Sequence, residues 1–113
     1  MPFIQTQVSI SVTKEQEEKL KERLGQAITV IGKSETWLMI RLEDNCRLFF
    51  QGEKSEKIAF VEIKLYGKAD RQSYEEMTKR VSDIFEEVLD IPKNKLYVTY
   101  QEYSHWGFNG SNF

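Results

Sequence analysis

The stretch Ile58-Ala59-Phe60-Val61-Glu62-Ile63-Lys64-Leu65-Tyr66 decides the fold of this chain of 113 residues. Its odd-numbered positions from 59 to 65 are all apolar, and such a two-residue period is typical of a β-strand. The segment 3–10 alternates in the same way, with one shared face made of Ile4, Thr6, Val8 and Ile10. Because the later strand restarts the pattern about half the chain after the first, the sequence predicts two halves of similar organisation.

The first half continues into a helix and further strands. Thr13 followed by Gln16 forms a capping box at the predicted helix start, and Gly32 suits the helix end. The apolar stripe of this helix consists of Leu20, Leu24, Ala27, Ile28 and Ile31. The predictions that follow are a strand over 37–42, a short strand over 47–50 and a polar loop over 51–57.

The second half repeats this order of elements. A turn and helix start are predicted over 67–72, and the apolar stripe of the helix consists of Tyr74, Met77, Val81, Ile84, Phe85 and Val88. Ile91-Pro92 ends this helix, because proline disfavours helical backbone at the residue before it. The last long strand is predicted over 96–102, and the tail 104–113 is rich in glycine, asparagine and aromatic residues.

Two βαβ halves predict an α+β fold, a two-layer α/β sandwich formed by a single domain of residues 1–113. We expect a four-stranded mixed sheet with both helices on one face. The opposite face also carries apolar side chains, because Trp37, Phe60 and Tyr97 fall on the strand parity that the helices do not cover. An apolar second face on so short a chain predicts that the protein is an oligomer.

Length and composition exclude several functional classes. Lys and Arg number 16 against 18 Asp and Glu, and the resulting net charge of −2 argues against a nucleic-acid binder held by bulk charge. No apolar run approaches the roughly 20 residues of a membrane span, and the amino terminus lacks the features of a secretory signal. We therefore expect a cytoplasmic location. Secretion by a route that needs no signal peptide stays an open alternative. So short a chain also predicts a ligand site that is shallow or shared between chains.

No metal site or cofactor is expected. Cys46 is the one cysteine, which excludes an intramolecular disulfide and a multi-cysteine metal site. His105 has no second histidine or cysteine at ligand spacing. The glycines Gly67 and Gly107 are isolated, so no glycine-rich loop is available to cradle a phosphate.

The amino terminus, Met1-Pro2-Phe3, offers a chemical group of its own. Initiator methionine is normally removed when a small residue such as proline follows, and the chain then begins with a prolyl secondary amine. An α-amine titrates near pH 8, and burial or a nearby cation lowers its pKa further, which makes it a candidate general base. In a parallel βαβ unit the junction at Gly32-Lys33 returns to the sheet end where the first strand starts. Lys33 is therefore expected beside Pro2, where it can favour the neutral amine and bind a carboxylate.

Several of these features together resemble the macrophage migration inhibitory factor branch of the tautomerase superfamily, and look closest to its bacterial members. The resemblance spans the whole chain and includes the βαβ–βαβ plan. The motifs that carry it are Met1-Pro2-Phe3-Ile4, Gly32-Lys33, Gly67-Lys68 with Ser73-Tyr74, Ile91-Pro92, Leu96-Tyr97-Val98, and the tail from Trp106 to Phe113.

The resemblance implies a homotrimer with active sites at the subunit interfaces, and keto–enol tautomerisation of phenylpyruvate-like 2-oxo acids without a cofactor. Pro2 matches the catalytic acid/base and Lys33 the lysine that binds the substrate carboxylate. Tyr97 matches a tyrosine contributed by the neighbouring subunit, and Tyr66 a residue whose backbone amide contacts the substrate. The remaining binding positions implied by the resemblance are Trp37, Thr99, Trp106, Phe108 and Phe113.

The sequence also departs from the family pattern. Thr99 stands where mammalian members have a substrate-binding asparagine, and the shorter side chain weakens that contact or passes it to a water molecule. Ile58 and Val61 replace the Cys-x-x-Cys of the mammalian cytokine, so thiol–disulfide oxidoreductase activity is not expected. No side chain is assigned to stabilise the enolate oxygen.

Three other readings stay open at this point. The first is a cytokine-like or protein-binding module that keeps the fold with a vestigial pocket. The second is another proline-dependent reaction, such as hydrolytic dehalogenation or decarboxylation, for which Arg41 is the candidate additional group. The third is a ferredoxin-like RNA-binding module, which also has two βαβ units; the acidic balance and the missing aromatic-basic strand signature count against it.

Overall fold

The computed structural model describes residues 1–54 and 57–113, and at Glu53 and Lys54 it describes the backbone alone. In chain order the elements are β1 (Pro2–Val8), α1 (Lys14–Ala27), the 3-10 helices η1 (Ile28–Ile31) and η2 (Glu35–Trp37), β2 (Met39–Glu43), β3 (Phe49–Phe50), β4 (Glu53–Lys54), β5 (Ala59–Tyr66), α2 (Arg71–Leu89), the 3-10 helix η3 (Lys93–Lys95), β6 (Leu96–Tyr103), β7 (Gly107–Phe108) and β8 (Ser111–Asn112). The order follows the two predicted halves.

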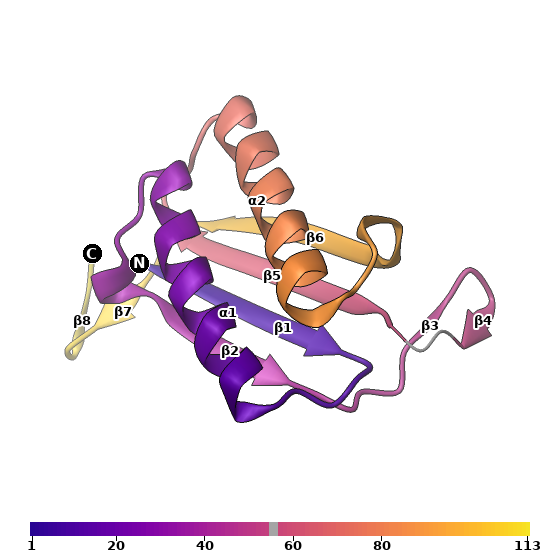
Figure 1. Ribbon diagram of the computed structural model, residues 1–113. Coiled ribbons are helices and arrows are strands. Elements are labelled where there is room, and N and C mark those ends of the chain that lie inside the picture. The colour runs from indigo at the N-terminus through magenta and orange to yellow at the C-terminus, as the bar shows by residue number, and fades with distance from the viewer. Residues whose placement is uncertain (55–56) are drawn as a thin grey trace.

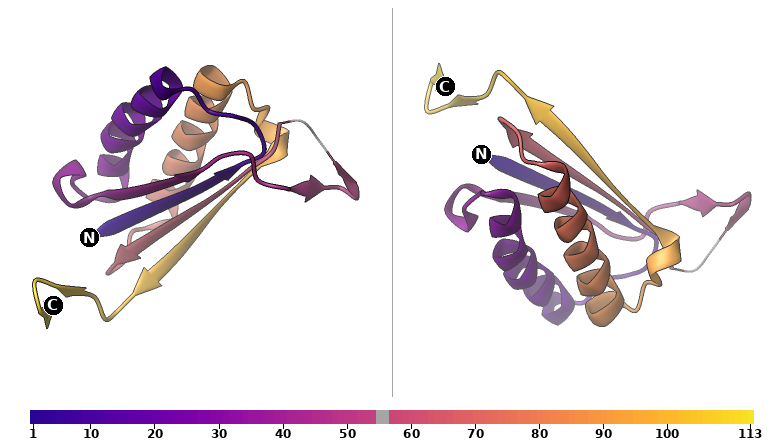
Figure 2. Two further views of the ribbon diagram at one scale, coloured as in Figure 1. Left: turned by 90° about the horizontal axis from the view of Figure 1, so that it is seen from below. Right: turned by 90° about the horizontal axis from the view of Figure 1, so that it is seen from above.

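Four of the strands form one mixed sheet in the order β2-β1-β5-β6. β1 pairs in parallel with β2 and antiparallel with β5, and β5 pairs in parallel with β6. Helices α1 and α2 lie side by side on one face of this sheet (Figure 1), and the view from below in Figure 2 shows that the opposite face carries no helix. The predicted α+β fold, with a four-stranded mixed sheet and two helices on one face, is confirmed.

Local sequence signals set the ends of both helices. At the start of α1 the Thr13 hydroxyl accepts from the Gln16 amide at 3.1 Å, and the Gln16 side chain accepts from the Thr13 amide at 2.9 Å. Gly32 closes η1 at φ 75°, a left-handed conformation that costs glycine little. Helix α2 ends just ahead of the predicted stop at Ile91-Pro92, because Asp90 already adopts a left-handed conformation at φ 57°.

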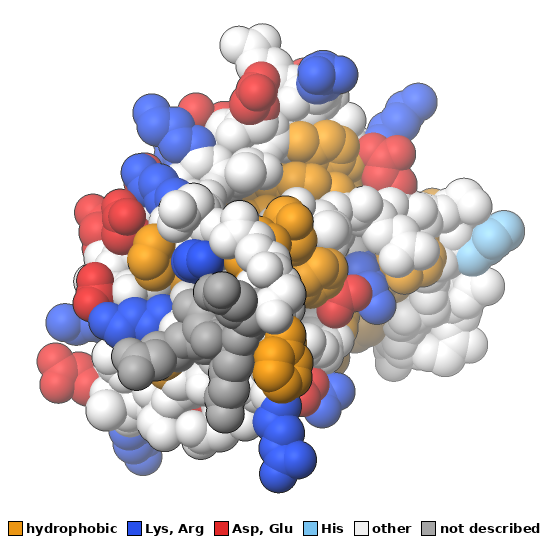
Figure 3. Space-filling view, turned by 90° about the vertical axis from the view of Figure 1, so that its right-hand side faces the viewer, with side chains coloured by type: hydrophobic (Ala, Val, Ile, Leu, Met, Phe, Trp, Pro, Cys, Tyr) orange, Lys and Arg blue, Asp and Glu red, His pale blue; other side chains and the backbone are white. Residues whose placement is uncertain are grey.

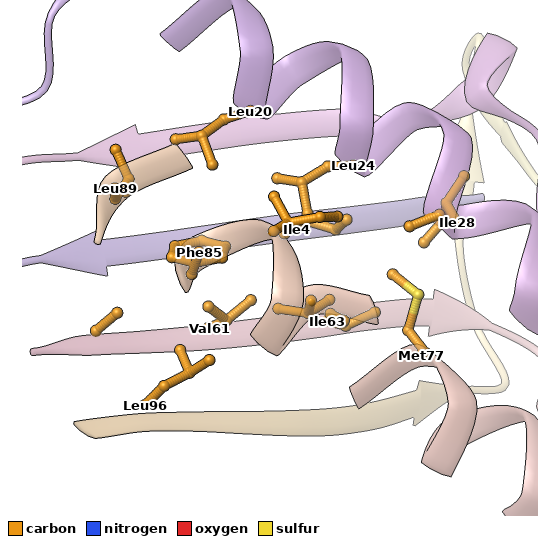
Figure 4. Close-up of a cluster of buried hydrophobic side chains, with 14 of the residues drawn as sticks. Ile4, Leu20, Leu24, Ile28, Val61, Ile63, Met77, Phe85, Leu89 and Leu96 are labelled. Atoms are coloured by element: carbon orange, nitrogen blue, oxygen red, sulfur yellow. The ribbon is translucent and has the colours of Figure 1, made fainter. Parts of the chain in front are cut away.

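The hydrophobic core lies between the two helices and the covered face of the sheet. Figure 4 shows its centre, where Leu24 and Phe85 from the helices come together with Ile4 and Ile63 from the strands. All four side chains are fully buried, and burying each one stabilises the fold by about 1.5–3 kcal/mol. The two-residue period of the strands therefore selects which face of the sheet the helices cover.

The open face of the sheet is less apolar than the strand pattern predicts. Tyr97 is 57% exposed and lies beside Phe60, as predicted. The middle of the face is polar, however, since the Gln5 amide donates to the Glu43 carboxylate at 3.0 Å and Arg41 forms an ion pair with the same carboxylate at 3.0 Å. The prediction of an apolar second face thus holds at the ends of the strands and fails at their centre.

Trp37 lies outside the sheet, which corrects the predicted strand over 37–42. The Ser34 hydroxyl accepts from the Thr36 amide at 3.1 Å and starts the short helix η2, so β2 begins only at Met39. Trp37 consequently does not belong to the open sheet face with Phe60.

Two short hairpins replace segments that were expected to be irregular. β3 and β4 pair antiparallel, so the predicted loop 51–57 contributes a strand, and residues 55–56 of that loop lie outside the described residues. In the tail, β7 and β8 pair around Asn109 and Gly110, whose φ values of 54° and 85° are typical of a type I′ turn. The two hairpins project from opposite ends of the main sheet (Figure 1).

The structure allows two statements about residues 1–54 and 57–113. Within these ranges no helix is long and apolar enough to cross a membrane. No group of three or more His, Cys, Asp or Glu side chains in the same ranges is placed to hold a metal ion. Cys46 is partly buried, and its thiol lies 3.5 Å from the Glu43 carbonyl oxygen.

Candidate active site

The start of β1 and the end of β5 meet at one edge of the main sheet. Pro2 is buried there and lies opposite Leu65 in the antiparallel ladder. The backbone of Tyr66 uses both of its polar groups at this edge. Its amide donates to the Met1 carbonyl at 3.0 Å, and its carbonyl accepts from the Lys33 ammonium at 2.7 Å. The ladder thus holds Pro2 in a defined position at the edge of the sheet.

Lys33 reaches this edge because the first crossover brings the chain back to the end of the sheet where β1 began. Gly32 turns the chain at the end of η1, and the partly buried Lys33 follows directly. Gly67, which follows Tyr66, is also close to the ammonium, since an added Cβ there would be 3.8 Å from the Lys33 Nζ. The sequence prediction that Lys33 lies beside Pro2 agrees with this geometry.

The environment of the amino terminus favours its neutral, unprotonated form. Partial burial disfavours the charged ammonium, and the positive charge of Lys33 acts in the same direction, so the pKa of the Met1 amine lies below its ordinary value of 8.0. An amine with a lowered pKa is available as a proton acceptor near neutral pH.

Aromatic side chains surround this edge of the sheet. The rings of Trp37 and Phe108 meet edge to face with centroids 5.1 Å apart. Phe113 lies against Tyr66 at 5.7 Å, and its amide donates to the Trp106 carbonyl at 3.1 Å. The tail hairpin therefore places three aromatic residues next to the edge that holds Pro2 and Lys33, and both chain ends lie there (Figure 1).

Two of the predicted binding residues, Tyr97 and Thr99, are not brought to this edge within one chain. Tyr97 pairs with Phe60 near the start of β5, six residues before Tyr66. At about 3.3 Å per residue this separation is about 20 Å. Tyr97 packs against Phe50, with ring centroids 5.1 Å apart. Figure 3 views this far end of the molecule and shows apolar side chains interspersed with charged ones.

Thr99 and Arg41 also lie away from the site, on the open face of the sheet. The Thr99 hydroxyl donates to the Val61 carbonyl at 3.4 Å. Arg41 is exposed and paired with Glu43, which is opposite Gln7 rather than near Pro2. Within one chain, the reading that uses Arg41 as an additional catalytic group has no geometric support.

The structure adds Tyr103, which is not among the predicted site residues. Its carbonyl accepts from the Gly67 amide at 2.9 Å, and its ring meets the Trp106 ring at 5.7 Å. The signal for it was present, because Tyr103 continues the two-residue period of the strand predicted over 96–102. That strand was ended one residue too early.

A surface groove between the two helices has a different chemistry. A groove of about 340 Å³ between α1 and α2 is lined by charged side chains that pair with one another. Arg23 contacts Glu87 at 2.7 Å, and Arg80 contacts Glu76 at 3.2 Å. The lining of this groove consists of charged, polar and aliphatic side chains, in contrast to the aromatic rings near Pro2.

Comparison with known proteins places these observations in a family. The model of the macrophage migration inhibitory factor (MIF) family matches residues 1–113. Leishmania major MIF2 is 31% identical, with a TM-score of 0.93, and the alignment covers 100% of this chain and 97% of that one. A macrophage migration inhibitory factor homologue from Prochlorococcus marinus is 27% identical, with a TM-score of 0.88 and 98% of both chains covered.

A more distant solved structure shares the fold. It is described as Pt0534 inactivated by 2-oxo-3-pentynoate, and it is 14% identical with a TM-score of 0.86, covering 96% of this chain and 93% of that one. Among curated proteins, no sequence matches the chain. Since the family model spans the whole sequence and a solved relative is 31% identical over all of this chain, the chain belongs to the macrophage migration inhibitory factor family.

Proposed function

We propose that the protein is a keto–enol tautomerase that acts on phenylpyruvate-like 2-oxo acids and depends on an amino-terminal proline. The observation that carries the proposal is the meeting of three groups at one sheet edge: buried Pro2, the Lys33 ammonium and the backbone amide of Tyr66. Membership of the family supports an isomerase of this class. Removal of Met1 is part of the proposal, because only then is the nitrogen of Pro2 a free secondary amine.

The reaction moves one proton between carbon and oxygen. Pro2, as a neutral amine, takes the proton from C3 of the keto acid, the electrons of that C–H bond form the C2–C3 double bond, and the carbonyl π electrons move to the oxygen. Water then donates a proton to the enolate oxygen, and the prolyl ammonium releases its proton to solvent. In the reverse direction the prolyl ammonium returns a proton to C3. Lys33 binds the substrate carboxylate and orients C3 toward the amine.

The Tyr66 amide is the proposed donor to a substrate oxygen. In the chain that begins with Met1, this amide donates to the Met1 carbonyl at 3.0 Å. Loss of Met1 removes that acceptor and leaves the amide directed at the space next to Pro2. A preformed backbone donor of this kind stabilises negative charge that develops on oxygen during the reaction.

The aromatic wall supports a substrate with a flat apolar group next to the 2-oxo acid. Trp37, Trp106, Phe108 and Phe113 are the proposed wall residues, all near the end of the sheet that holds Lys33. The inactivation of the distant relative by 2-oxo-3-pentynoate, itself a 2-oxo acid, is consistent with this substrate class.

A homotrimer completes the proposal. Tyr97 is 57% exposed and about 20 Å from the site of its own chain, so it can contribute only to the site of a neighbouring copy. The helix-free sheet face and the exposed aromatic residues at its ends supply surface for such contacts. Thr99 belongs to the same proposed contribution from the neighbour.

Intact mass and activity measured on one sample test this proposal. We expect a mass that lacks Met1 and rapid equilibration of phenylpyruvate enol and keto forms. An alanine inserted before Pro2 converts the proline nitrogen to an amide and should abolish activity, and Pro2→Gly, which keeps an amine but loses the ring, should reduce it strongly. If the Met1-free protein accelerates the reaction no more than buffer does, the proposal fails and a protein-binding role for the fold is favoured.

A further inference from the structure

A second layer of contacts lies behind Lys33, in the loop of residues 67–70 that joins β5 to α2. The loop starts directly after Tyr66, whose carbonyl accepts from the Lys33 ammonium at 2.7 Å. Gly67 has φ 85°, and an added Cβ there would be 3.8 Å from the Lys33 Nζ. Tyr66 and Gly67, where the loop begins, are therefore the residues next to the ammonium.

The end of β6 holds this loop at two points. The Gly67 amide donates to the Tyr103 carbonyl at 2.9 Å. The Ala69 amide donates to the Tyr74 hydroxyl oxygen at 3.2 Å, and that hydroxyl donates to the Glu102 carboxylate at 2.6 Å. The Tyr74 hydroxyl thus connects the loop, the first turn of α2 and the last residues of β6. The position of the loop therefore depends on this hydroxyl.

The phenol itself is held in place. Its ring lies 4.5 Å from the ring of Tyr100, and the Tyr100 hydroxyl donates to the Tyr74 carbonyl at 3.1 Å. Burial and the bond to Glu102 raise the pKa of Tyr74 to about 12, so the hydroxyl keeps its proton and remains a donor across the physiological range.

We infer that Tyr74 and Glu102 are positioning residues for the substrate-binding Lys33. Their hydrogen bond holds the loop 67–70, and the loop sets where the ammonium meets a substrate carboxylate. The inference rests on the proposed function, to which it adds a pair of residues that does not touch the substrate. Because the pair acts through Lys33, it affects recognition of the carboxylate more than proton transfer at Pro2.

The variant Tyr74→Phe tests this inference, because it keeps the ring on Tyr100 and removes only the hydroxyl. For phenylpyruvate we expect KM to rise roughly 5-fold, the size of one lost hydrogen bond, with kcat changed less than about 2-fold. The methyl ester of the same acid lacks the carboxylate, so its KM should stay the same. Glu102→Gln keeps a neutral acceptor for the phenol and should give a smaller rise in KM for the acid.

Tyr100→Phe is the matched control. It also removes a hydroxyl that bonds to α2, at the Thr78 hydroxyl and the Tyr74 carbonyl, but it keeps the ring that packs on Tyr74 and leaves the bonds of the Tyr74 hydroxyl to Ala69 and Glu102 in place. We expect it to lower stability without changing the difference between acid and ester. In a Lys33→Met background, Tyr74→Phe should raise KM no further. Equal changes for acid and ester, or a rise that persists without Lys33, would overturn the inference.

A measurement without turnover separates this inference from the proposed function. If the wild type equilibrates neither the acid nor its ester, the proposed function fails, and the position of Lys33 is read from the amino-terminal amine by NMR titration. In protein that retains Met1, burial and, to a smaller extent, the charge of Lys33 lower the pKa of the Met1 amine, so the titration is made on that form. Tyr74→Phe should therefore raise it toward the value in Lys33→Met, and an unchanged pKa would contradict the positioning role.

Discussion

Replacing Lys33 with methionine separates recognition of the carboxylate from the rest of the site. The ammonium is partly buried and already donates a 2.7 Å hydrogen bond to the Tyr66 carbonyl, so a substrate carboxylate meets a positioned charge rather than a freely moving one. A hydrogen bond to a charged group contributes about 1.5–3 kcal/mol. We therefore expect kcat/KM for phenylpyruvate to fall about 10- to 150-fold in Lys33→Met.

The assay compares the acid with its methyl ester in three proteins. The ester cannot form the ion pair, so Lys33→Met should change its kcat/KM by less than about 3-fold, which is below the lower bound for a hydrogen bond to a charged group. Lys68→Met is the matched control, because Lys68 is a nearby exposed lysine, one residue beyond Gly67. It should leave both substrates unaffected.

Two results would refute the reasoning. If Lys33→Met lowered activity on the acid by less than about 5-fold, the ammonium would contribute no more than an exposed ion pair, whose usual upper limit is about 1 kcal/mol. If Lys68→Met lowered it equally, the effect would come from the overall charge of this region and not from the placement of Lys33.

Three further predictions concern the terminus, the core and the neighbouring subunit. The pKa of the Met1 amine is lowered in the folded chain, so the folded state binds fewer protons than the unfolded state. In protein that retains Met1, this difference should make the folded state more stable above pH 8.0, and the gain should be lost as the pH falls through the folded-state pKa of the amine. The free energy of unfolding in urea, measured against pH for this chain and for the amino-terminally acetylated chain, checks the prediction. Phe85→Ala should lower the free energy of unfolding by about 3–5 kcal/mol, because the ring is fully buried. The control Phe49→Ala removes a side chain that is 71% exposed and should change the free energy of unfolding by less than about 1 kcal/mol. Equal losses in the two variants would contradict the described core. Tyr97→Ala should lower kcat/KM although the residue is about 20 Å from the site of its own chain, and mixing it with Pro2→Gly should restore activity in hybrid trimers; absence of any loss would remove Tyr97 from the site.

Short-range signals predicted most of the fold. The alternation of residues 58–66 and 3–10 identified the two central strands, and the observed β5 and β1 match them within two residues at each end. The capping box at Thr13 and Gln16 formed as expected. These signals are readable because they arise within a few residues of backbone, where the physical constraint and the sequence pattern coincide.

Two local features were not predicted, although each arises within a few residues of the chain. Ser34 caps the turn at Thr36 and takes Trp37 out of the strand, which a two-residue period cannot reveal. The turn at Asn109-Gly110 is a recognised hairpin signal, and here it joins the short strands of the tail.

The sequence also predicted one part of the candidate site and left another part undetermined. The return of a βαβ crossover to its starting edge predicted that Lys33 lies near Pro2, and the 2.7 Å bond to Tyr66 fits that expectation. The placement of Tyr97 at the far end of β5 also follows from strand register, but its contribution to a neighbouring site requires a second chain.

The sequence by itself determined the order of strands and helices along the chain, the buried face of the two central strands and the position of the amino terminus at the start of a strand. Those properties follow from backbone periodicity and from the residue types themselves. Only the tertiary structure decided that the middle of the open face is polar, that the tail packs its aromatic rings beside Lys33, and that Tyr74 and Glu102 support the loop under it. The physical reason is that these contacts join residues far apart in the chain, so they exist only after the core has brought the strands and helices together.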